Sequence, residues 1–211
     1  MTAGSAPGGS STGLSATPGH AIVVVPVTPE RWPEVALLMG GAAADRGCWC
    51  QYWRQSSSGY ARLGEGGGRR ALRAQIEGQP APGVVAYIET EPVGWCGFGP
   101  RRDMERLVRS RTIPVVDDVP VWSIVCFLVR TGHRRRGVAR ALLDGAIAYA
   151  RSMGAPALEA YPIDPEGRRL DVAFSYVGFT SMFEAAGFRR VVETAAQSAG
   201  RPRWLVRLDL G

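Results

Sequence analysis

The feature that most constrains the fold is the run VPVWSIVCFLV at residues 119–129, the most apolar stretch of the chain. Such a run predicts a buried central strand. A turn containing GHRRRG follows, and apolar residues then recur at helical spacing until Gly154, where we expect the helix to end. We therefore expect a strand, a turn and a helix in succession. The residues expected on the buried helix face are Val138, Leu142, Gly145, Tyr149 and Met153.

Three consecutive arginines, Arg134, Arg135 and Arg136, stand where this helix is expected to begin. Cations oppose the positive end of the helix dipole, so the arrangement is unfavourable unless an anion binds there. Free N–H groups in a first helical turn, a glycine that admits close backbone approach, and arginine side chains together favour phosphate binding. The alternative is a solvated helix start in a chain that contains no lysine. We expect a pyrophosphate at this turn.

The other segments alternate between strand-like and helix-like patterns. This order predicts an α/β (α+β) domain over residues 20–211, with a mixed central sheet and helices on both faces. Residues 1–19 are rich in small residues and are expected to form a flexible tail that is not a secretory signal. Further strands are expected at residues 20–27, 84–89, 93–99, 157–161, 188–193 and 203–210, and further helices at 28–39, 69–77, 101–110 and 180–186.

Composition narrows the function classes. The formal net charge is +6, but the arginines are scattered rather than gathered into one stripe, so we expect no nucleic-acid partner. No run approaches the length of a membrane span. Four cysteines without a secreted-type spacing favour a reducing, cytoplasmic location. With two histidines in the chain, Cys48 and Cys50 lack a second ligand pair, so we expect no metal site.

The pattern Arg134-x-x-Gly137-x-Ala139, placed directly after the predicted strand, resembles the acyl-CoA pyrophosphate motif of the GNAT superfamily of N-acetyltransferases. Neither GxGxxG nor the P-loop pattern is present. The order of elements from residue 20 to residue 210 is also similar, as is MFEAAGF at residues 182–188. The resemblance implies a sheet that splays between the strands at 119–129 and 157–161, with the pantetheine arm of acetyl-CoA in the gap.

The resemblance also implies which residues bind acetyl-CoA. The backbone of the pre-motif strand would pair with the pantetheine amides, while the turn and the first helical turn would hold the pyrophosphate. His133 takes the place of an aromatic residue that often packs against the turn in the family, so we do not expect it to be a base. The implied cofactor-binding residues are Phe127, Leu128, Val129, Arg134, Arg135, Arg136, Gly137, Val138, Ala139 and Arg140.

Two catalytic groups that are usual in the family do not carry over. Ser123 stands at the position of the glutamate base, and Phe183 stands at the position of the tyrosine acid. A thiolate leaves without much help from an acid, so transfer could proceed chiefly by holding the amine and the thioester together. A water molecule could also take the proton. Of the remaining candidates, which are Glu159, Tyr161, Asp171, Ser175 and Tyr176, we expect Glu159 and Tyr176 to act in catalysis.

The segment CWCQYWR at residues 48–54 falls in the region that walls the acceptor site in GNAT-like proteins. Trp49, Tyr52 and Trp53 would then line a pocket for an apolar or aromatic amine. Alternatively, these side chains form a packed lid in which Cys48 and Cys50 serve as small apolar residues. A nucleophilic cysteine would need an activating histidine, and neither thiol has one close in sequence.

The expected function is transfer of an acetyl group from acetyl-CoA to the primary amine of a small molecule, such as a metabolite or an antibiotic. A peptide or protein N-acetyltransferase is one alternative. An acyl-CoA-binding regulatory module without turnover is another, and the missing glutamate and tyrosine favour it. The sequence is compatible with a homodimer but does not fix the oligomeric state.

Overall fold

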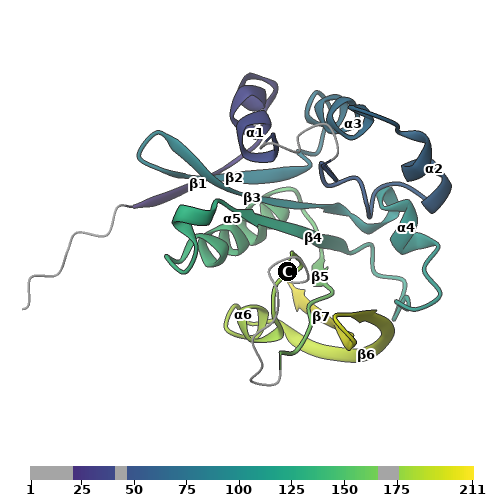
Figure 1. Cartoon of the computed structure of the whole chain (residues 1–211). Helices are drawn as coiled ribbons and strands as arrows, with labels where there is room; N and C mark the ends of the chain where they lie inside the picture. Colours follow the sequence, from purple (N-terminus) through teal and green to yellow (C-terminus); the bar gives the residue numbers. More distant parts are fainter. Residues whose placement is uncertain (1–20, 41–46, 166–175) are drawn as a thin grey trace, which may run out of the picture.

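One seven-stranded mixed sheet organises the chain (Figure 1). The computed structural model describes residues 21–40, 47–165 and 176–211. The strand order is β1-β2-β3-β4-β5-β7-β6, and every neighbouring pair is antiparallel except β4 and β5. The strands are β1 (Ile22–Pro26), β2 (Gly83–Ile88), β3 (Glu91–Pro100), β4 (Trp122–Val129), β5 (Ala157–Ala160), β6 (Arg189–Ser198) and β7 (Arg201–Asp209). The predicted α/β class with a mixed sheet is confirmed.

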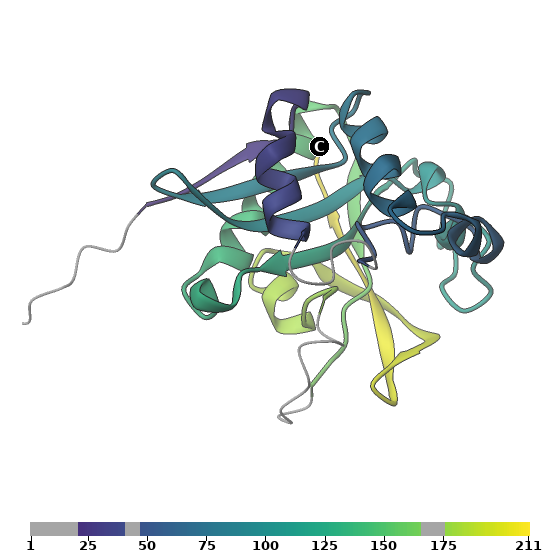
Figure 2. The same cartoon turned by 45° about the horizontal axis from the view of Figure 1, so that its top comes forward.

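Helices cover both faces of this sheet (Figures 1 and 2). Helix α5 packs on one face of β1 to β4, where Leu142 and Ala146 enter the larger hydrophobic core. Helices α1 and α3 pack on the other face, where Val35 and Leu72 are fully buried. The α-helices in the described residues are α1 (Trp32–Met39), α2 (Ser57–Arg62), α3 (Gly67–Ile76), α4 (Glu105–Val108), α5 (Val138–Ser152) and α6 (Thr180–Glu184).

The predicted opening in the middle of the sheet is confirmed by the pairing of β4. Only the first residues of β4, Trp122 to Ile124, pair with Leu158 to Ala160 of β5, while β4 continues to Val129. The paired half of β4 is buried, and its last four residues are only partly buried. In the open half, the Phe127 N–H donates a hydrogen bond of 2.6 Å to the carbonyl oxygen of Tyr176. The gap therefore begins directly after Ile124.

Two expectations for the helices need correction. The helices expected from the sequence leave out residues 57–62, which form α2; its start is capped by Ser56, whose hydroxyl accepts a hydrogen bond of 3.1 Å from the Gly59 N–H. Its sequence, SSGYAR, carries no apolar repeat that could reveal a helix. Met153 is 44% exposed rather than buried, because the stripe that faces the sheet runs through Ala146, Ile147 and Ala150.

Gly145 allows α5 to lie close to the sheet. A Cβ atom at this position would stand 2.4 Å from Val24 Cγ1 of β1, so any side chain would push the helix away. The helix positions the turn that precedes it, because Val138 at its start is also buried against the sheet. No helix in the described ranges combines the length and apolar character needed to cross a membrane. The predicted N-terminal tail, Asp171 and Ser175 lie outside the described residues.

Candidate active site

The arginine-rich turn joins β4 to the N-terminus of α5. Gly137 precedes the helix with a φ of +83°, and Arg135 also has a positive φ, of +60°. The first helical hydrogen bond runs from the Ala141 N–H to the Gly137 carbonyl oxygen over 3.0 Å. The N–H groups of residues 138–140 therefore have no acceptor within the helix, as at any helix start. They form a positive end suited to an anion.

The side chains at this turn carry unneutralised charge, with one exception. Arg134, Arg135 and Arg136 are exposed and form no ion pair with a carboxylate in the described part of the chain, although Arg134 Nε donates to the Val129 carbonyl oxygen over 3.2 Å. Arg140 is the exception, because its guanidinium is held by Asp144 at 3.0 and 3.1 Å and by a backbone carbonyl. Arg140 can offer a pyrophosphate its backbone N–H rather than its side chain.

A cavity of about 660 Å³ lies beside this turn. The end of α1 forms one wall through Leu37 and Leu38, and the end of β4 forms another through Leu128 and Val129. Arg134 also lines it. Three of the residues predicted to bind acetyl-CoA thus face one space. Apolar walls that meet Arg134 fit a ligand with an extended arm and an anionic group.

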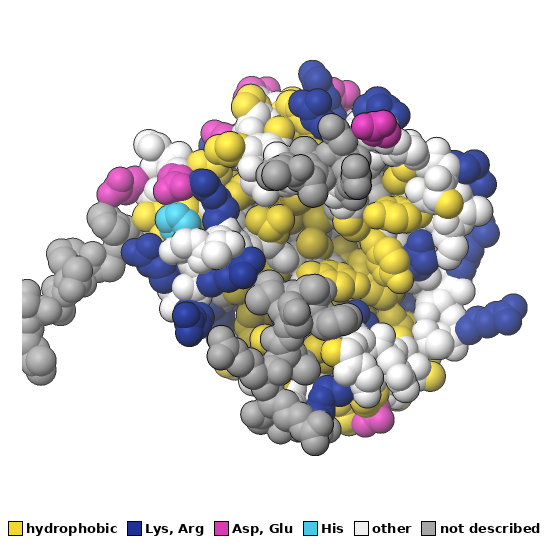
Figure 3. Space-filling model, in the orientation of Figure 1, with side chains coloured by type: hydrophobic (Ala, Val, Ile, Leu, Met, Phe, Trp, Pro, Cys, Tyr) yellow, Lys and Arg dark blue, Asp and Glu magenta, His cyan; other side chains and the backbone are white. Residues whose placement is uncertain are grey.

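A second cavity, of about 710 Å³, lies on the side of the sheet opening nearer β7. We call it the aromatic cavity because Tyr52, Trp53 and Tyr176 line it together with Arg203. In Figure 3, apolar side chains gather in the middle of the face where β4 stands above β6 and β7 in Figure 1, and arginines stand around them. The other residues that line the aromatic cavity are Ser56, Ser57, Ser58, Arg106, Arg109, Ser110, Arg111, Thr112, Ile113, Ala195, Ala196 and Gln197.

Trp49 does not join Tyr52 and Trp53 at the aromatic cavity. It is 3% exposed and stacks on Trp32 with the ring centroids 5.8 Å apart, inside the core beneath α1 and α3. Its φ of +46° turns the chain, so that neighbouring aromatic residues of one short segment point to different places. Trp49 thus packs in the core, as the packed-lid alternative expects, and does not line the aromatic cavity.

Tyr176 is the predicted catalytic residue that reaches the aromatic cavity. Its hydroxyl accepts a hydrogen bond of 3.4 Å from Arg203 Nη2, and its carbonyl oxygen is bonded to Phe127 in the open half of β4. Burial raises the pKa of Tyr176 above its usual value of 10, so the phenol keeps its proton at neutral pH. Phe183, at the family's acid position, is fully buried with its ring against Phe127 and Phe188.

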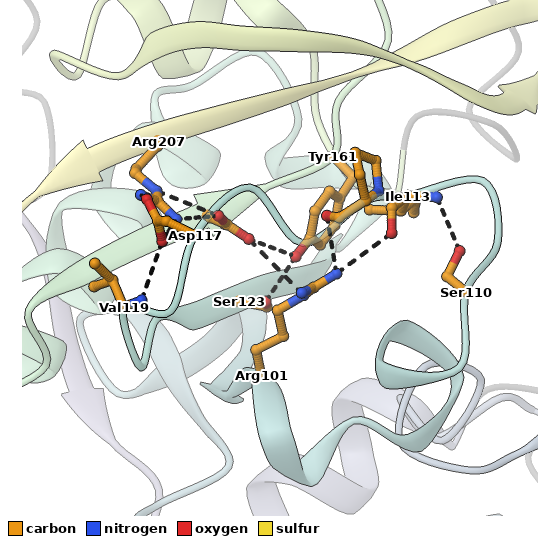
Figure 4. A network of polar contacts seen from close by, with 10 residues as sticks. Arg101, Ser110, Ile113, Asp117, Val119, Ser123, Tyr161 and Arg207 are labelled. Carbon is orange, nitrogen blue, oxygen red and sulfur yellow. Dashed lines mark hydrogen bonds and ion pairs between the residues drawn. The ribbon is translucent and has the colours of Figure 1, made fainter.

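Glu159, the other predicted catalytic residue, is buried and lies in a charge network. Figure 4 labels its partners Arg101, Tyr161 and Arg207. Ser123, Glu159 and Arg207 form a row across β4, β5 and β7. The Glu159 carboxylate accepts hydrogen bonds of 2.7 and 3.2 Å from Arg207 and one of 3.1 Å from Tyr161. Tyr161 also contacts Ser123 Oγ at 2.9 Å. We define the Glu159 network as these four residues with Arg101 and Asp117, which pair with Glu159 and Arg207 respectively.

The structure does not bring Glu159 and Tyr176 together. Glu159 is 2% exposed and lines a separate cavity of about 360 Å³, together with Trp122 and Asp117. The reason is the position of the opening: β5 still pairs with β4 at Glu159, and the gap starts only afterwards. Tyr161 links the two places, because its hydroxyl contacts Glu159 while its carbonyl oxygen accepts a hydrogen bond from Arg203.

The two cysteines of the aromatic segment also differ. Cys50 is buried, and its Sγ accepts a hydrogen bond of 3.0 Å from Trp95 Nε1. A hydrogen bond from the Cys126 thiol lowers the pKa of Cys50, whereas burial raises the pKa of Cys48. Within the described residues, no group of three or more histidine, cysteine or acidic side chains is arranged to hold a metal ion.

Arg203 is the site residue that sequence reasoning missed. It alternates with Leu205 and Arg207 on one face of β7, whose middle is mostly apolar. Two arginines on the buried face of a strand are unusual, because arginine is rarely buried without a partner. This pattern in RPRWLVRLD was the signal that could have identified it.

Comparison with known proteins agrees with this geometry. The model of the acetyltransferase (GNAT) family matches residues 49–170. A structure described as histone acetyltransferase HPA2 and related acetyltransferase, from Corynebacterium glutamicum, is 23% identical, with 88% of this chain and 94% of that chain covered and a TM-score of 0.51.

Two further solved structures are similar in fold. A putative GNAT acetyltransferase from Desulfovibrio desulfuricans is 16% identical, with 90% of this chain and 100% of that chain covered and a TM-score of 0.52. The NatC complex bound to Gag peptide and CoA is 13% identical, with 90% and 99% covered and a TM-score of 0.53. No curated protein matches the sequence. Because the family model covers more than half of the chain, the protein belongs to the GNAT family of acetyltransferases.

Proposed function

We propose that the protein transfers the acetyl group of acetyl-CoA to the primary amine of a small molecule. GNAT acetyltransferases use acetyl-CoA as the acetyl donor. The observation that carries the proposal is the open half of β4, which lies between an anion-binding turn at one end and the aromatic cavity at the other. An arrangement of this kind would hold the thioester and the amine close together.

The residues that would hold acetyl-CoA follow from the geometry of the turn. The N–H groups of Val138, Ala139 and Arg140 would bind the pyrophosphate, together with Gly137, which lets the ligand approach the backbone. The side chains of Arg134, Arg135 and Arg136 would add charge-assisted hydrogen bonds. Phe127, Leu128 and Val129 would pair with the amides of the pantetheine arm. The residues proposed to bind acetyl-CoA are therefore Phe127, Leu128, Val129, Arg134, Arg135, Arg136, Gly137, Val138, Ala139 and Arg140.

The reaction needs two proton movements. The amine nitrogen forms a bond to the acetyl carbonyl carbon, the carbon–sulfur bond breaks, the nitrogen loses a proton and the thiolate gains one. Tyr176 is the residue suited to the second movement, because it lines the aromatic cavity beside β4 and its raised pKa keeps the phenol protonated. The proton from nitrogen passes to water.

We assign Glu159 a positioning role instead of the role of a direct base. Its carboxylate is already held by Arg207, Arg101 and Tyr161, and it lies outside the aromatic cavity. Through these bonds it fixes Tyr161, whose carbonyl oxygen in turn orients Arg203 at the cavity wall. Glu159 therefore acts on the site through Tyr161.

The small-molecule acceptor is favoured because the cavity has a volume of about 710 Å³, within the range of small-ligand sites, and is lined by Tyr52 and Trp53. The test is CoA release from acetyl-CoA with a panel of small amines, amino acids and short peptides, with products identified by mass spectrometry. An acetylated small amine is the expected result. Acetylation of peptides alone would contradict the small-molecule assignment, and acetyl-CoA binding without any product would favour a regulatory module.

A further inference from the structure

Strand β7 carries two arginines that are equally buried but differently neutralised. Arg203 and Arg207 are each 4% exposed. Arg207 is paired with the carboxylates of Glu159 and Asp117. Arg203 contacts no carboxylate in the ranges that the structure describes: its Nη1 donates to the Tyr161 carbonyl oxygen at 3.0 Å and its Nη2 to the Tyr176 hydroxyl at 3.4 Å. A buried charge without a counter-ion is costly.

The position of Arg203 indicates where a bound anion could neutralise its charge. Its guanidinium lies between the rings of Trp53 and Tyr176, at 5.9 and 5.6 Å from their centroids, in the wall of the aromatic cavity. Burial lowers its pKa, which reflects the same uncompensated cost. Trp53 Nε1 is also buried and finds no hydrogen-bond acceptor within the described ranges. An arginine without a carboxylate partner and an indole N–H without an acceptor, both within the described residues, therefore line one cavity.

The rest of the cavity adds positive charge and no carboxylate. Among its described lining residues are Arg106, Arg109 and Arg111, and none is acidic. Arg109 is neutralised by Glu105 outside the lining, at 2.7 Å. Arg106 is bonded to uncharged oxygen atoms and lies over the Tyr52 ring at 4.2 Å. The cavity is therefore cationic as well as aromatic.

We propose that the acceptor is an amine that also carries a carboxylate, and that Arg203 binds this carboxylate in the aromatic cavity. The inference rests on the proposed function and narrows its substrate class. Arginine matches a planar carboxylate with two parallel hydrogen bonds. The apolar or aromatic body of the acceptor would lie against Tyr52 and Trp53, and the carboxylate would be unchanged by acetyl transfer. A plain hydrophobic amine would leave Arg203 without a counter-ion.

The experiment compares acceptors that differ only in this group. For several aromatic and aliphatic bodies, kcat/KM is measured for the amino acid, its amide and the decarboxylated amine, with acetyl-CoA saturating. We expect the amino acid to exceed both neutral partners by about tenfold or more, as a charge-assisted hydrogen bond allows. Equal or faster acetylation of the neutral amines overturns the proposal. A phosphonate analogue that exceeds the carboxylate by the same margin overturns the choice of carboxylate.

The variant Arg203→Gln assigns the effect to this residue. It should reduce the preference for the carboxylate to about twofold or less, while calorimetry gives an unchanged Kd for acetyl-CoA. Arg73→Gln on α3 is the matched control: it removes one positive charge from a side chain that is 62% exposed and lies outside the cavity lining. A preference that survives in Arg203→Gln contradicts the assignment. If this variant does not fold, the kcat/KM ratios of the wild type for the amino acid, its amide and the decarboxylated amine still test the proposal.

Failure of the proposed function gives a different result. In that case acetyl-CoA binds and no amine of any class is acetylated. Binding of the same acceptor pairs is then followed by ligand-observed NMR in the presence of CoA. A carboxylate member that binds while its amide does not supports the anion site independently of turnover, and equal binding or no binding overturns it.

Discussion

Within the described residues, the buried arginines of the Glu159 network are neutralised by carboxylates, whereas several arginines at the turn before α5 and in the aromatic cavity are not. In the network, Arg207 and Arg101 are buried beside carboxylates of the same chain. At the turn before α5 and in the aromatic cavity, Arg135, Arg136 and Arg203 have no carboxylate partner in the part of the chain that the structure describes. Within the network, positive and negative side chains of the same chain neutralise each other, and their contacts link β4, β5 and β7. We propose that the other arginines receive their counter-ion from a bound ligand, which would separate ligand-binding from structural arginines.

The largest effect on stability is expected when Arg207 is removed from the Glu159 network. Arg207→Met leaves Glu159 buried with Arg101 as its remaining cation, at 3.9 Å, and should lower the free energy of unfolding by about 3 to 5 kcal/mol. Urea denaturation measures the change. As a control, Arg189→Met removes an exposed pair with Asp209 and should cost less than about 1 kcal/mol. A loss below about 1 kcal/mol for Arg207→Met would erase the distinction between the two sets of arginines.

The anion site at the turn is probed by Gly137→Asp. A Cβ here meets only Ile22 Cδ1, at 3.9 Å, so the fold should survive the strain of a positive φ. The new carboxylate would occupy the phosphate position, and we expect acetyl-CoA affinity to fall by about a hundredfold, or about 2.8 kcal/mol. Calorimetry measures the Kd.

Gly154→Asp gives the matched control for this substitution. Gly154 follows the same helix at its other end, also with a positive φ, of +72°, and with open space around it. Its variant should bind acetyl-CoA as the wild type does. Similar losses in both variants would mean that backbone strain, not the anion site, is responsible.

A smaller effect is expected at Tyr176. Tyr176→Phe removes the phenol but keeps the ring, and we expect kcat to fall by about tenfold, because a thiolate departs readily even without an acid. The KM for acetyl-CoA should stay within about twofold. Since burial raises the pKa of Tyr176 above its usual value, the proton is present throughout the neutral range, and wild-type activity should show no loss from this group in that range. An unchanged kcat would remove the acid role.

The smallest effect on stability is expected at Arg203, and it bears directly on the comparison with Arg207. Arg203→Gln should change the free energy of unfolding by less than about 1 kcal/mol, because the variant removes an uncompensated buried charge and keeps a donor for the Tyr161 carbonyl oxygen. Thermal or urea denaturation tests this beside Arg207→Met. A loss as large as that of Arg207→Met would assign Arg203 to the structural set.

Much of the fold could be predicted from the sequence because its signals are local. The apolar run that forms β4, the glycine at the start of α5 and the hairpin of β2 and β3 each follow from short patterns. Helix α2 could not be found, because its stability comes from a serine cap and tertiary contacts instead of an apolar repeat. Met153 was misplaced because small residues such as Ala146 and Ala150 carry the buried stripe.

The candidate site divides in the same way. The arginine turn is contiguous, so its residues could be named from the sequence alone. The aromatic cavity is assembled from segments around residues 52, 106, 176 and 203, which only the sheet brings together. Likewise, the ion pairs that hold Glu159 lie across strands distant in sequence, so its confinement away from Tyr176 could not be deduced from its place on an alternating strand.

The hydrogen bond between Phe127 and Tyr176 makes ligand entry an exchange reaction. The donor on β4 is already satisfied by the Tyr176 carbonyl oxygen, so a pantetheine amide that pairs there must replace one hydrogen bond with another. The net free energy of that contact is consequently small, and the binding energy must come mainly from the pyrophosphate end. Loss of the hydrogen bond between Phe127 and Tyr176 would also move Tyr176, which lines the aromatic cavity. Binding of acetyl-CoA would therefore change the site that receives the acceptor.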